Sequence, residues 1–337
     1  MGYRAEKLKV ERQIKLLKRI LLSILLVCIL ALCIFSAFVP PKTWKYRVSL
    51  PKVSKCPQGS VRIHFLDVGQ GDATLIELPD GKVVLIDGGD GSSTAKRTLI
   101  RYINALKIDK IDHLIVTHTD ADHCGGLYTL LEQKRVLNAY LPPSFSETDG
   151  AYAKFYAALL KTDCERYTAS RALQITGGAT ADSTQYNLFF VYPQTLSTEQ
   201  ETEDTDANAS SAVVWLDYHN CNVLFMGDAP AETEAQILLE ASLGILPSNG
   251  MDLSGTEILK VSHHGSGDST TAAFLEYLNA KEAVISCGAG NVYGHPDEGT
   301  LQRLQEAGAS VHRTDTDGTI VATIDQNGRY TITKSKN

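Results

Sequence analysis

Apolar and polar positions divide the chain into one long uncharged stretch and a series of short periodic segments. Residues 20–39 carry no charged side chain, and as a helix they would rise about 30 Å, the thickness of the hydrocarbon core of a membrane. From residue 61 onward, short apolar runs alternate with turns and with stretches whose apolar residues recur at helical spacing. The pattern predicts one membrane-spanning helix followed by a mixed α/β domain.

The periodic segments predict the order of strands and helices in that domain. Strands are expected at 61–67, 73–78, 83–87, 113–117, 212–216, 222–226, 258–262, 283–286, 319–324 and 330–333, the last two forming a hairpin. Helices are expected at 94–106, 125–131, 151–160, 232–239, 271–278 and 298–305, and the rest of 142–186 is expected to be irregular. Strands come first as adjacent pairs and later alternate with helices, which predicts a four-layer αββα sandwich of two mixed sheets with helices outside.

The flanks of the apolar stretch favour an uncleaved anchor. A cleavable signal peptide has a shorter apolar core and a small-x-small exit, whereas this stretch ends with Phe38-Val39 and then Pro40-Pro41, which stop the helix. A processed signal is the alternative interpretation. Seven Lys or Arg residues precede the stretch, which favours a cytoplasmic N-terminus and an extracytoplasmic domain.

Charge changes sharply along the chain and sets the boundaries that we expect. Residues 1–19 hold seven basic and two acidic residues, residues 40–60 hold five basic and none acidic, and residues 61–337 hold 20 basic and 37 acidic. We therefore expect a basic segment (1–19), a transmembrane anchor in contact with lipid (20–39), an extended basic linker (40–60) and the α/β domain (61–337). The linker either rests on anionic lipid or is simply solvated, and the acidic domain does not coat nucleic acid by charge alone.

The densest chemical signal follows the apolar run that ends at residue 117. His118, Asp120, Asp122 and His123 fall within six residues at the point where a strand gives way to a helix. Buried carboxylates repel one another and lose hydration, so they need a cation or hydrogen-bond donors nearby. The cluster therefore predicts a metal site.

This cluster resembles the H-x-H-x-D-H signature of the metallo-β-lactamase superfamily, with Asp120 where the second histidine is usual. Residues 61–325 resemble more narrowly the hydrolase-like domain of the ComEC-type competence proteins, which take up DNA. The matching stretches occur in the order of that family: Phe65–Ala73, Leu85–Gly89, His118–His123 with Gly125-Gly126, Gly227–Ala229, Ser262–Ser266 and Tyr293–Pro296. The resemblance implies the αββα metallo-β-lactamase fold. It does not imply DNA uptake by this chain alone, because one helix cannot form a channel, and a separate membrane channel partner is left open.

The resemblance also implies two divalent metal ions about 3.5–4 Å apart that share a hydroxide. The first ion would be held by His118 and Asp120, the second by Asp122, His123 and His264, and both by Asp228 as a bridge. His263 is the alternative to its neighbour His264. Relatives often supply a third histidine to the first site, but residues 208–211 read Asn-Ala-Ser-Ser, so that site is expected to be weak. Three carboxylates and three imidazoles leave Zn²⁺ and Mn²⁺ both open.

Other residues allow two interpretations each. Asp87 either holds the metal loop or caps its own turn, and Gly69–Asp72 either lets backbone approach a ligand or is a structural turn. His295 either contacts phosphate and protonates a leaving oxygen or fixes its own loop by a hydrogen bond. Ser266 either contacts substrate or, as the simpler interpretation, caps a helix near residue 269. A nucleophilic serine mechanism through Ser262 beside His263 is an alternative, but the absence of the strand–elbow–helix motif around a glycine-flanked serine argues against it.

The expected reaction is hydrolysis of a phosphodiester in DNA or nucleotides, with Asp122 and His295 as catalytic residues. A metal pair neutralises an anionic substrate and delivers a nucleophile in line. The alternatives are a cell-envelope phosphodiester, a lactone or β-lactam, and a binding module without catalysis.

Overall fold

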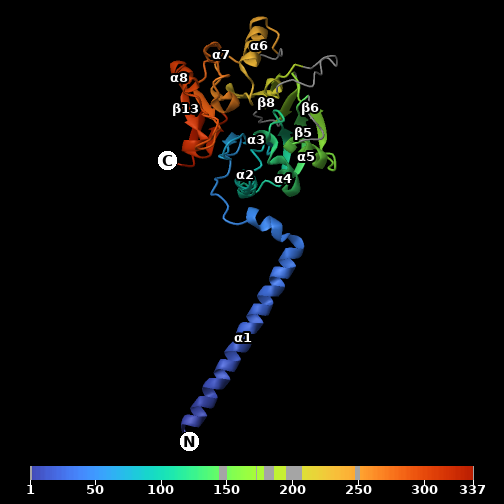
Figure 1. The fold of residues 1–337 in the computed structure, drawn as a ribbon, viewed down its shortest axis with the longest axis vertical. Coiled ribbons are helices and arrows are strands. Elements are labelled where there is room, and N and C mark those ends of the chain that lie inside the picture. Colours follow the sequence, from blue (N-terminus) through green and yellow to red (C-terminus); the bar gives the residue numbers. More distant parts are fainter. Residues whose placement is uncertain are drawn as a thin grey trace. The chain divides into compact units, whose positions relative to one another are not determined.

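The computed structural model describes residues 2–143, 150–171, 173–177, 186–194, 207–246 and 251–336. The chain divides into two units, Met1–Ser49 and Leu50–Asn337. In the first unit, helix α1 (Gly2–Phe38) runs through both the basic segment and the apolar stretch and ends just before Pro40, as the sequence predicts (Figure 1). By length and composition, α1 is the one helix among the described residues that could cross a membrane.

The start of the linker differs from the extended segment that we expected. Residues Pro41–Tyr46 form the 3₁₀ helix η1, whose first residue is a proline. The Nε1–H of Trp44 donates to the carbonyl of Val39 at 3.0 Å, and the ring of Trp44 lies 5.7 Å from that of Phe35. These local contacts favour a compact turn directly after the apolar helix over an extended chain.

The second unit contains two mixed sheets. The first sheet has the strand order β15 (Tyr330–Lys334), β14 (Ile320–Ile324), β1 (Val61–Phe65), β2 (Thr74–Glu77), β3 (Val83–Ile86), β4 (Lys110–Ile115), β5 (Arg135–Leu141) and β6 (Glu165–Thr168). The second sheet has the order β13 (Ser310–Arg313), β12 (Glu282–Ile285), β11 (Ile258–Lys260), β10 (Cys221–Phe225), β9 (Val213–Tyr218), β8 (Tyr186–Tyr192) and β7 (Gln174–Gly177). Strands β3 to β6 are parallel in the first sheet, as are β10 to β13 in the second.

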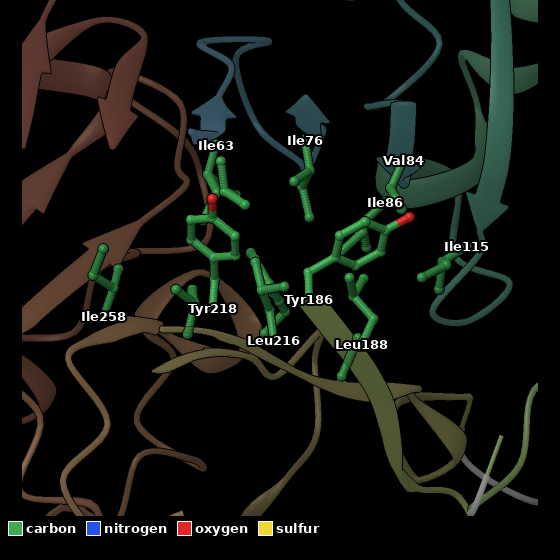
Figure 2. Close-up of a cluster of buried hydrophobic side chains, with 14 of the residues drawn as sticks. Ile63, Ile76, Val84, Ile86, Ile115, Tyr186, Leu188, Leu216, Tyr218 and Ile258 are labelled. Atoms are coloured by element: carbon green, nitrogen blue, oxygen red, sulfur yellow. The ribbon is translucent and has the colours of Figure 1, made fainter. Parts of the chain in front are cut away.

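The main core lies between the two sheets. Figure 2 shows Ile63 and Val84 of the first sheet facing Tyr186 and Leu216 of the second, and all four side chains are fully buried. Burying such side chains is the dominant stabilising term for a domain of this size.

Helices cover the outer faces of the two sheets. Helices α6 (Ala231–Ser242), α7 (Ala272–Leu278) and α8 (Glu298–Glu306) pack on the second sheet through a separate apolar cluster that includes Trp215 and Phe274. Helices α2 (Ser93–Ala105), α4 (Leu127–Gln133) and α5 (Gly150–Leu159) lie on the side of the first sheet (Figure 1). The four-layer αββα prediction is confirmed.

The sequence pattern did not predict every strand and cap that the structure contains. Every strand expected from the pattern is present within a few residues, but β5, β6, β7, β8 and β13 were missed, three of them wholly or partly in the stretch expected to be irregular. Strand β6 is exposed along its whole length, so no alternation marked it. The capping role expected for Ser266 is wrong: Thr271 caps α7 by accepting from the backbone N–H of Phe274 at 3.3 Å. The sequence 198–208 is rich in acidic residues and threonine and is expected to be a loop, and most of it lies outside the described residues.

Candidate metal centre

His118 and Asp120 lie in the loop that follows β4, at the carboxyl end of a parallel strand, and Asp122 and His123 lie in the short helix α3 (Ala121–Cys124) directly after this loop. His118 and His123 are completely buried, whereas the side chain of Asp122 is 31% exposed and that of Asp120 is 50% exposed. The loop and helix therefore present two buried imidazoles toward the interior and two carboxylates toward the opening of the site.

Two further segments bring ligands from the second sheet. Asp228 follows β10, and His264 lies in the 3₁₀ turn η3 (Ser262–Gly265) that follows β11. Because β10 and β11 are parallel neighbours, their carboxyl ends meet at one edge of the sheet. His263 and His264 both adopt positive φ values, of 46° and 54°, so the turn bends sharply, and the two imidazole rings lie at 63° to each other with centroids 6.2 Å apart.

Asp122, His123, Asp228 and His264 converge on one point. The Nε2 atom of His264 lies 3.2 Å from Asp122 Oδ2 and 3.5 Å from Asp228 Oδ2. The Nε2 atom of His123 lies 3.2 Å from Asp228 Oδ2 and 3.2 Å from Nε2 of His264. Four polar atoms this close inside a protein need a shared cation or shared protons between them. This is the group expected to hold the second ion.

The group expected to hold the first ion is more open. His118 Nε2 lies 3.9 Å from Asp228 Oδ2 and 3.7 Å from Asp120 Oδ2, and it is a buried nitrogen without a hydrogen-bond partner. Asp228 therefore stands between the two groups, in the place expected of a bridge. Where relatives often supply a third histidine, Ser211 is buried and its Oγ accepts the backbone N–H of Asp228 at 3.2 Å.

The geometry separates His263 from His264. His264 is buried and faces Asp122 and His123, whereas the His263 side chain is 22% exposed. The Nε2 atom of His263 lies 3.8 Å from Asp228 Oδ2, and its Nδ1 atom lies 3.2 Å from Asp268 Oδ1. His264 thus belongs to the second group, and His263 flanks the bridge.

Hydrogen bonds on the far side of the imidazoles hold the Nε2 atoms toward the centre. His123 Nδ1 lies 2.8 Å from Asp87 Oδ2, and His264 Nδ1 lies 2.9 Å from the carbonyl of Ser286. Asp87 also accepts the backbone N–H and the hydroxyl of Thr117, at 2.9 and 2.7 Å. Such contacts place the proton on Nδ1 and leave Nε2 free to bind a metal. Of its two interpretations, Asp87 therefore fits the one in which it holds the metal loop.

Sequence reasoning left Asp72 undecided and overlooked its partner Lys260. One atom each of Asp72, His123, Asp228 and His264 lie within 4.8 Å of one another, and all four residues are buried. The buried ammonium of Lys260 donates to Asp72 Oδ2 at 2.7 Å and to the carbonyl of Val261 at 3.0 Å. The missed signal is a lysine inside the apolar run 258–261, since a buried ammonium requires an anion beside it.

The charges of the cluster are strongly coupled. Burial opposes ionisation of Asp228, but His123 and His264 outweigh it and hold the pKa of Asp228 well below its ordinary value. Burial likewise opposes protonation of His123, but Asp228 and Asp87 raise its pKa well above the ordinary value. Burial raises the pKa of Asp122, but the hydrogen bond from His264 and the charge of His123 lower it to about 2. A cation placed here meets carboxylates that are already ionised.

His295 lies beside this cluster in the loop between β12 and α8. Its ring centroid is 5.5 Å from that of His263 and 6.3 Å from that of His264. The backbone of His295 bonds to the side chain of Asn291, but its own Nδ1 is buried without a partner. Burial, followed by the neighbouring His264 and His263, lowers the pKa of His295. The loop is therefore fixed without the imidazole, which favours a contact with substrate.

The residues present fit a pair of divalent ions. The atoms that could bind a metal are imidazole nitrogens and carboxylate oxygens. Two of them, His118 Nε2 and Asp228 Oδ1, are buried without hydrogen-bond partners. Buried polar atoms without a hydrogen-bond partner are rare in native proteins, and a bound ion is one explanation for them. Mixed sets of this kind suit Zn²⁺ and Mn²⁺.

Comparison with known proteins gives matches along most of the chain. A family model described as the metallo-beta-lactamase superfamily matches residues 66–289. "ComE operon protein 3" of Bacillus subtilis is 29% identical over 281 residues, covering 79% of this chain and 33% of that protein. "Recombination protein 2" of Haemophilus influenzae is 29% identical over 262 residues, covering 77% of this chain and 28% of that protein. The chain thus spans about a third of the length of these curated relatives.

Solved structures give more distant matches. A structure described as a new diphosphatase from the PhnP family has a TM-score of 0.43 and 13% sequence identity, covering 75% of this chain and 94% of that one. A likeness of this degree carries no argument about the substrate.

Proposed function

Because the chain belongs to the metallo-beta-lactamase superfamily, we propose that it is a metal-dependent phosphodiesterase that acts on DNA or nucleotides. The single observation that carries the proposal is the convergence of buried imidazoles and carboxylates from three segments around Asp228. The competence proteins among its relatives support a nucleic-acid substrate.

Each residue of the cluster has a distinct task in this proposal. A bound pair of divalent ions supplies positive charge for a phosphodiester anion and an activated water nucleophile. His118 and Asp120 would hold one ion, and Asp122, His123 and His264 the other, with Asp228 between them. Because Asp122 is partly exposed and ionised, its outer oxygen can also accept a hydrogen bond from the attacking water and orient it.

His295 would contact the substrate beside His263 and His264, whose ring centroids lie 5.5 and 6.3 Å from its own. Its pKa is lowered, so the imidazole is neutral near pH 7 and retains one N–H to donate. A neutral imidazole is better suited to donating a hydrogen bond to a phosphoryl oxygen than to protonating the leaving oxygen outright. Removing such a donor slows an enzyme by about 100- to 1000-fold in comparable sites.

The experiment uses the full chain in detergent, loaded with Mn²⁺ or Zn²⁺. It is offered bis(p-nitrophenyl) phosphate, linear single-stranded and duplex DNA, a glycerol phosphodiester and nitrocefin. We expect turnover of the model diester and DNA, abolished in Asp228→Asn and preserved in Asp163→Asn, an exposed carboxylate outside the cluster. Hydrolysis of nitrocefin alone would overturn the proposal. Turnover of the glycerol diester alone would indicate that the substrate is a cell-envelope phosphodiester rather than nucleic acid.

A binding module without catalysis is the second candidate, favoured by the openness of the first group. Metal analysis separates the two. If the proposed active site is correct, the native chain binds two ions and the His118→Gln variant binds one. One ion in the native chain, unchanged in His118→Gln and accompanied by no turnover, would establish the binding module instead.

We also propose that the apolar residues 20–39 anchor the enzyme in a membrane with its second unit outside the cytoplasm. The charge of the preceding segment supports this orientation. If the enzyme serves the transport of nucleic acid, we expect it to act beside a membrane channel. Protease added outside intact cells should digest the second unit, and its protection there would overturn the orientation.

A further inference from the structure

The loop that carries His295 also displays two large exposed side chains next to the candidate metal centre. Val292 is 92% exposed and Tyr293 is 66% exposed. The ring of Tyr293 is stacked on that of His295 at 5.9 Å and 27°, and His295 is in turn stacked on His264 at 6.3 Å and 25°. Three roughly parallel rings thus lead from the buried cluster to the surface.

The loop holds Tyr293 in place through its backbone. The side chain of Asn291 accepts the backbone N–H groups of Tyr293 and His295, at 3.1 and 3.0 Å, and donates to the carbonyl of Gly288 at 2.9 Å. Gly294, between the two stacked residues, has a φ of +74°, which a residue with a side chain rarely adopts. A ring fixed in this way loses little freedom when a ligand covers it.

We infer that Tyr293 is a stacking platform for a nucleobase of a single-stranded nucleic acid whose phosphodiester lies at the metal centre. This inference rests on the proposed function and names its substrate more narrowly. Every base has a π-face that an exposed aromatic ring can cover, whereas the bases of a duplex are already stacked on each other.

Charge supports the same occupant. Residues 61–337 carry 37 acidic and 20 basic side chains, so this unit is poorly equipped to hold a long strand by its phosphates. Affinity for a strand must then come from the metal centre and from contacts to bases. Tyr293 is the exposed aromatic ring that stacks onto the cluster among the residues the structure describes.

The test compares strands with and without bases. A single-stranded oligonucleotide and the same strand with abasic nucleotides beside the cleaved bond are offered to the native chain, Tyr293→Ala, Tyr293→Trp and the control Tyr167→Ala. Tyr167 lies on β6, is 40% exposed and is likewise stacked, on Tyr140. We expect Tyr293→Ala to lower kcat/KM about 5- to 100-fold on the base-bearing strand and to leave the abasic strand unchanged. Tyr293→Trp should restore the rate, and Tyr167→Ala should have no effect.

Binding provides a second measurement that does not depend on turnover. A strand containing 2-aminopurine should lose fluorescence when it binds Asp228→Asn, and this quenching should disappear when Tyr293→Ala is added. Equal rates for native and Tyr293→Ala chains on both strands would overturn the platform while the phosphodiesterase stands.

Two further outcomes identify other failures. No hydrolysis of either strand or of bis(p-nitrophenyl) phosphate by the native chain would remove the proposed function itself. Loss of binding to anionic vesicles in Val292→Asp, with unchanged strand hydrolysis in Tyr293→Ala, would assign the loop to a lipid surface and overturn the inference.

Discussion

Replacing Lys260 by methionine should destabilise the second unit strongly while conserving its shape. Lys260 is 2% exposed, and its ammonium lies 2.7 Å from a carboxylate oxygen of Asp72, which is 4% exposed. At an effective dielectric constant of about 20, the attraction across that distance is about 6 kcal/mol before the desolvation of both groups is subtracted. Removing one partner of a buried pair typically costs about 3–5 kcal/mol, because the other charge is left unpaired. We expect Lys260→Met to lower the free energy of unfolding by that amount.

The pH of the measurement follows from the sign of the pKa shift. Burial raises the pKa of Asp72, but Lys260 and then His264 outweigh it and lower the pKa below its ordinary value. The contribution of the pair is therefore complete above the ordinary pKa of an aspartate and is lost as the pH falls through the lower, folded-state value. At pH 7 the whole effect is present.

The assay is a double-mutant cycle. Urea unfolding of native chain, Lys260→Met, Asp72→Asn and the double variant is followed at pH 7 with a chelator present, by the fluorescence of the buried Trp215. The double variant should be more stable than the sum of the single changes predicts, with a coupling energy of about 2–3 kcal/mol. A cost below about 1 kcal/mol for Lys260→Met, or no coupling to Asp72, would refute the argument that this ion pair supports the metal-binding edge.

Three further predictions concern the metal and pH. Asp87→Asn should weaken metal affinity about 10- to 100-fold, because Asp87 holds His123 by its Nδ1, and calorimetry would measure it; unchanged affinity would deny that role. Burial opposes protonation of His123 and His264, but Asp228 with Asp87 holds the pKa of His123 well above its ordinary value, and Asp228 with Asp122 raises that of His264. Metal binding should therefore release protons and tighten as pH rises; calorimetry in buffers of different ionisation enthalpy counts them, and a count of zero would contradict the charge coupling. Burial, and then Lys82, lower the pKa of His113 to about 4 in the folded chain, whereas the unfolded chain keeps the ordinary value of 6.5. As pH falls below about 6.5, the unfolded chain therefore binds this proton before the folded chain does, and stability decreases. After allowance for partial exposure, stability should fall by about 1–2 kcal/mol more in the native chain than in His113→Gln between pH 7.5 and 4.5, and parallel urea curves would count against this.

The fold was largely predictable because alternation and helical spacing report burial. The strands that face the main core were found directly from the sequence: β1 alternates apolar and polar residues, and β3 is an unbroken apolar run. Strand β6 could not be found in this way, since all its residues are exposed and it is placed by backbone pairing to β5 and by the stacking of Tyr167 on Tyr140. Such an edge strand is determined by its neighbour rather than by its own residues.

The candidate site was predictable to the extent that its residues are close in sequence. His118 to His123 form a cluster that any reading of the chain would single out, but the meeting with Asp228 and His264 depends on parallel strand ends from the other sheet. The family resemblance implied that these residues come together, whereas their spacing in the sequence did not predict it. The contact of Lys260 with Asp72 joins residues 188 positions apart, and no local pattern encodes it.

The two halves of the cluster are supported unequally, and this inequality shapes the chemistry. His123 and His264 each donate a hydrogen bond from Nδ1, to Asp87 and to the carbonyl of Ser286, so their geometry is fixed before any ion arrives. Asp120, by contrast, is half exposed, and Ser211 stands where a third imidazole would enclose the first ion. An enclosed position holds its ion firmly, whereas an open position leaves coordination sites for substrate oxygens. The departure of this chain from the usual signature therefore fits a site that admits an anionic substrate at the first position while the second position stays anchored.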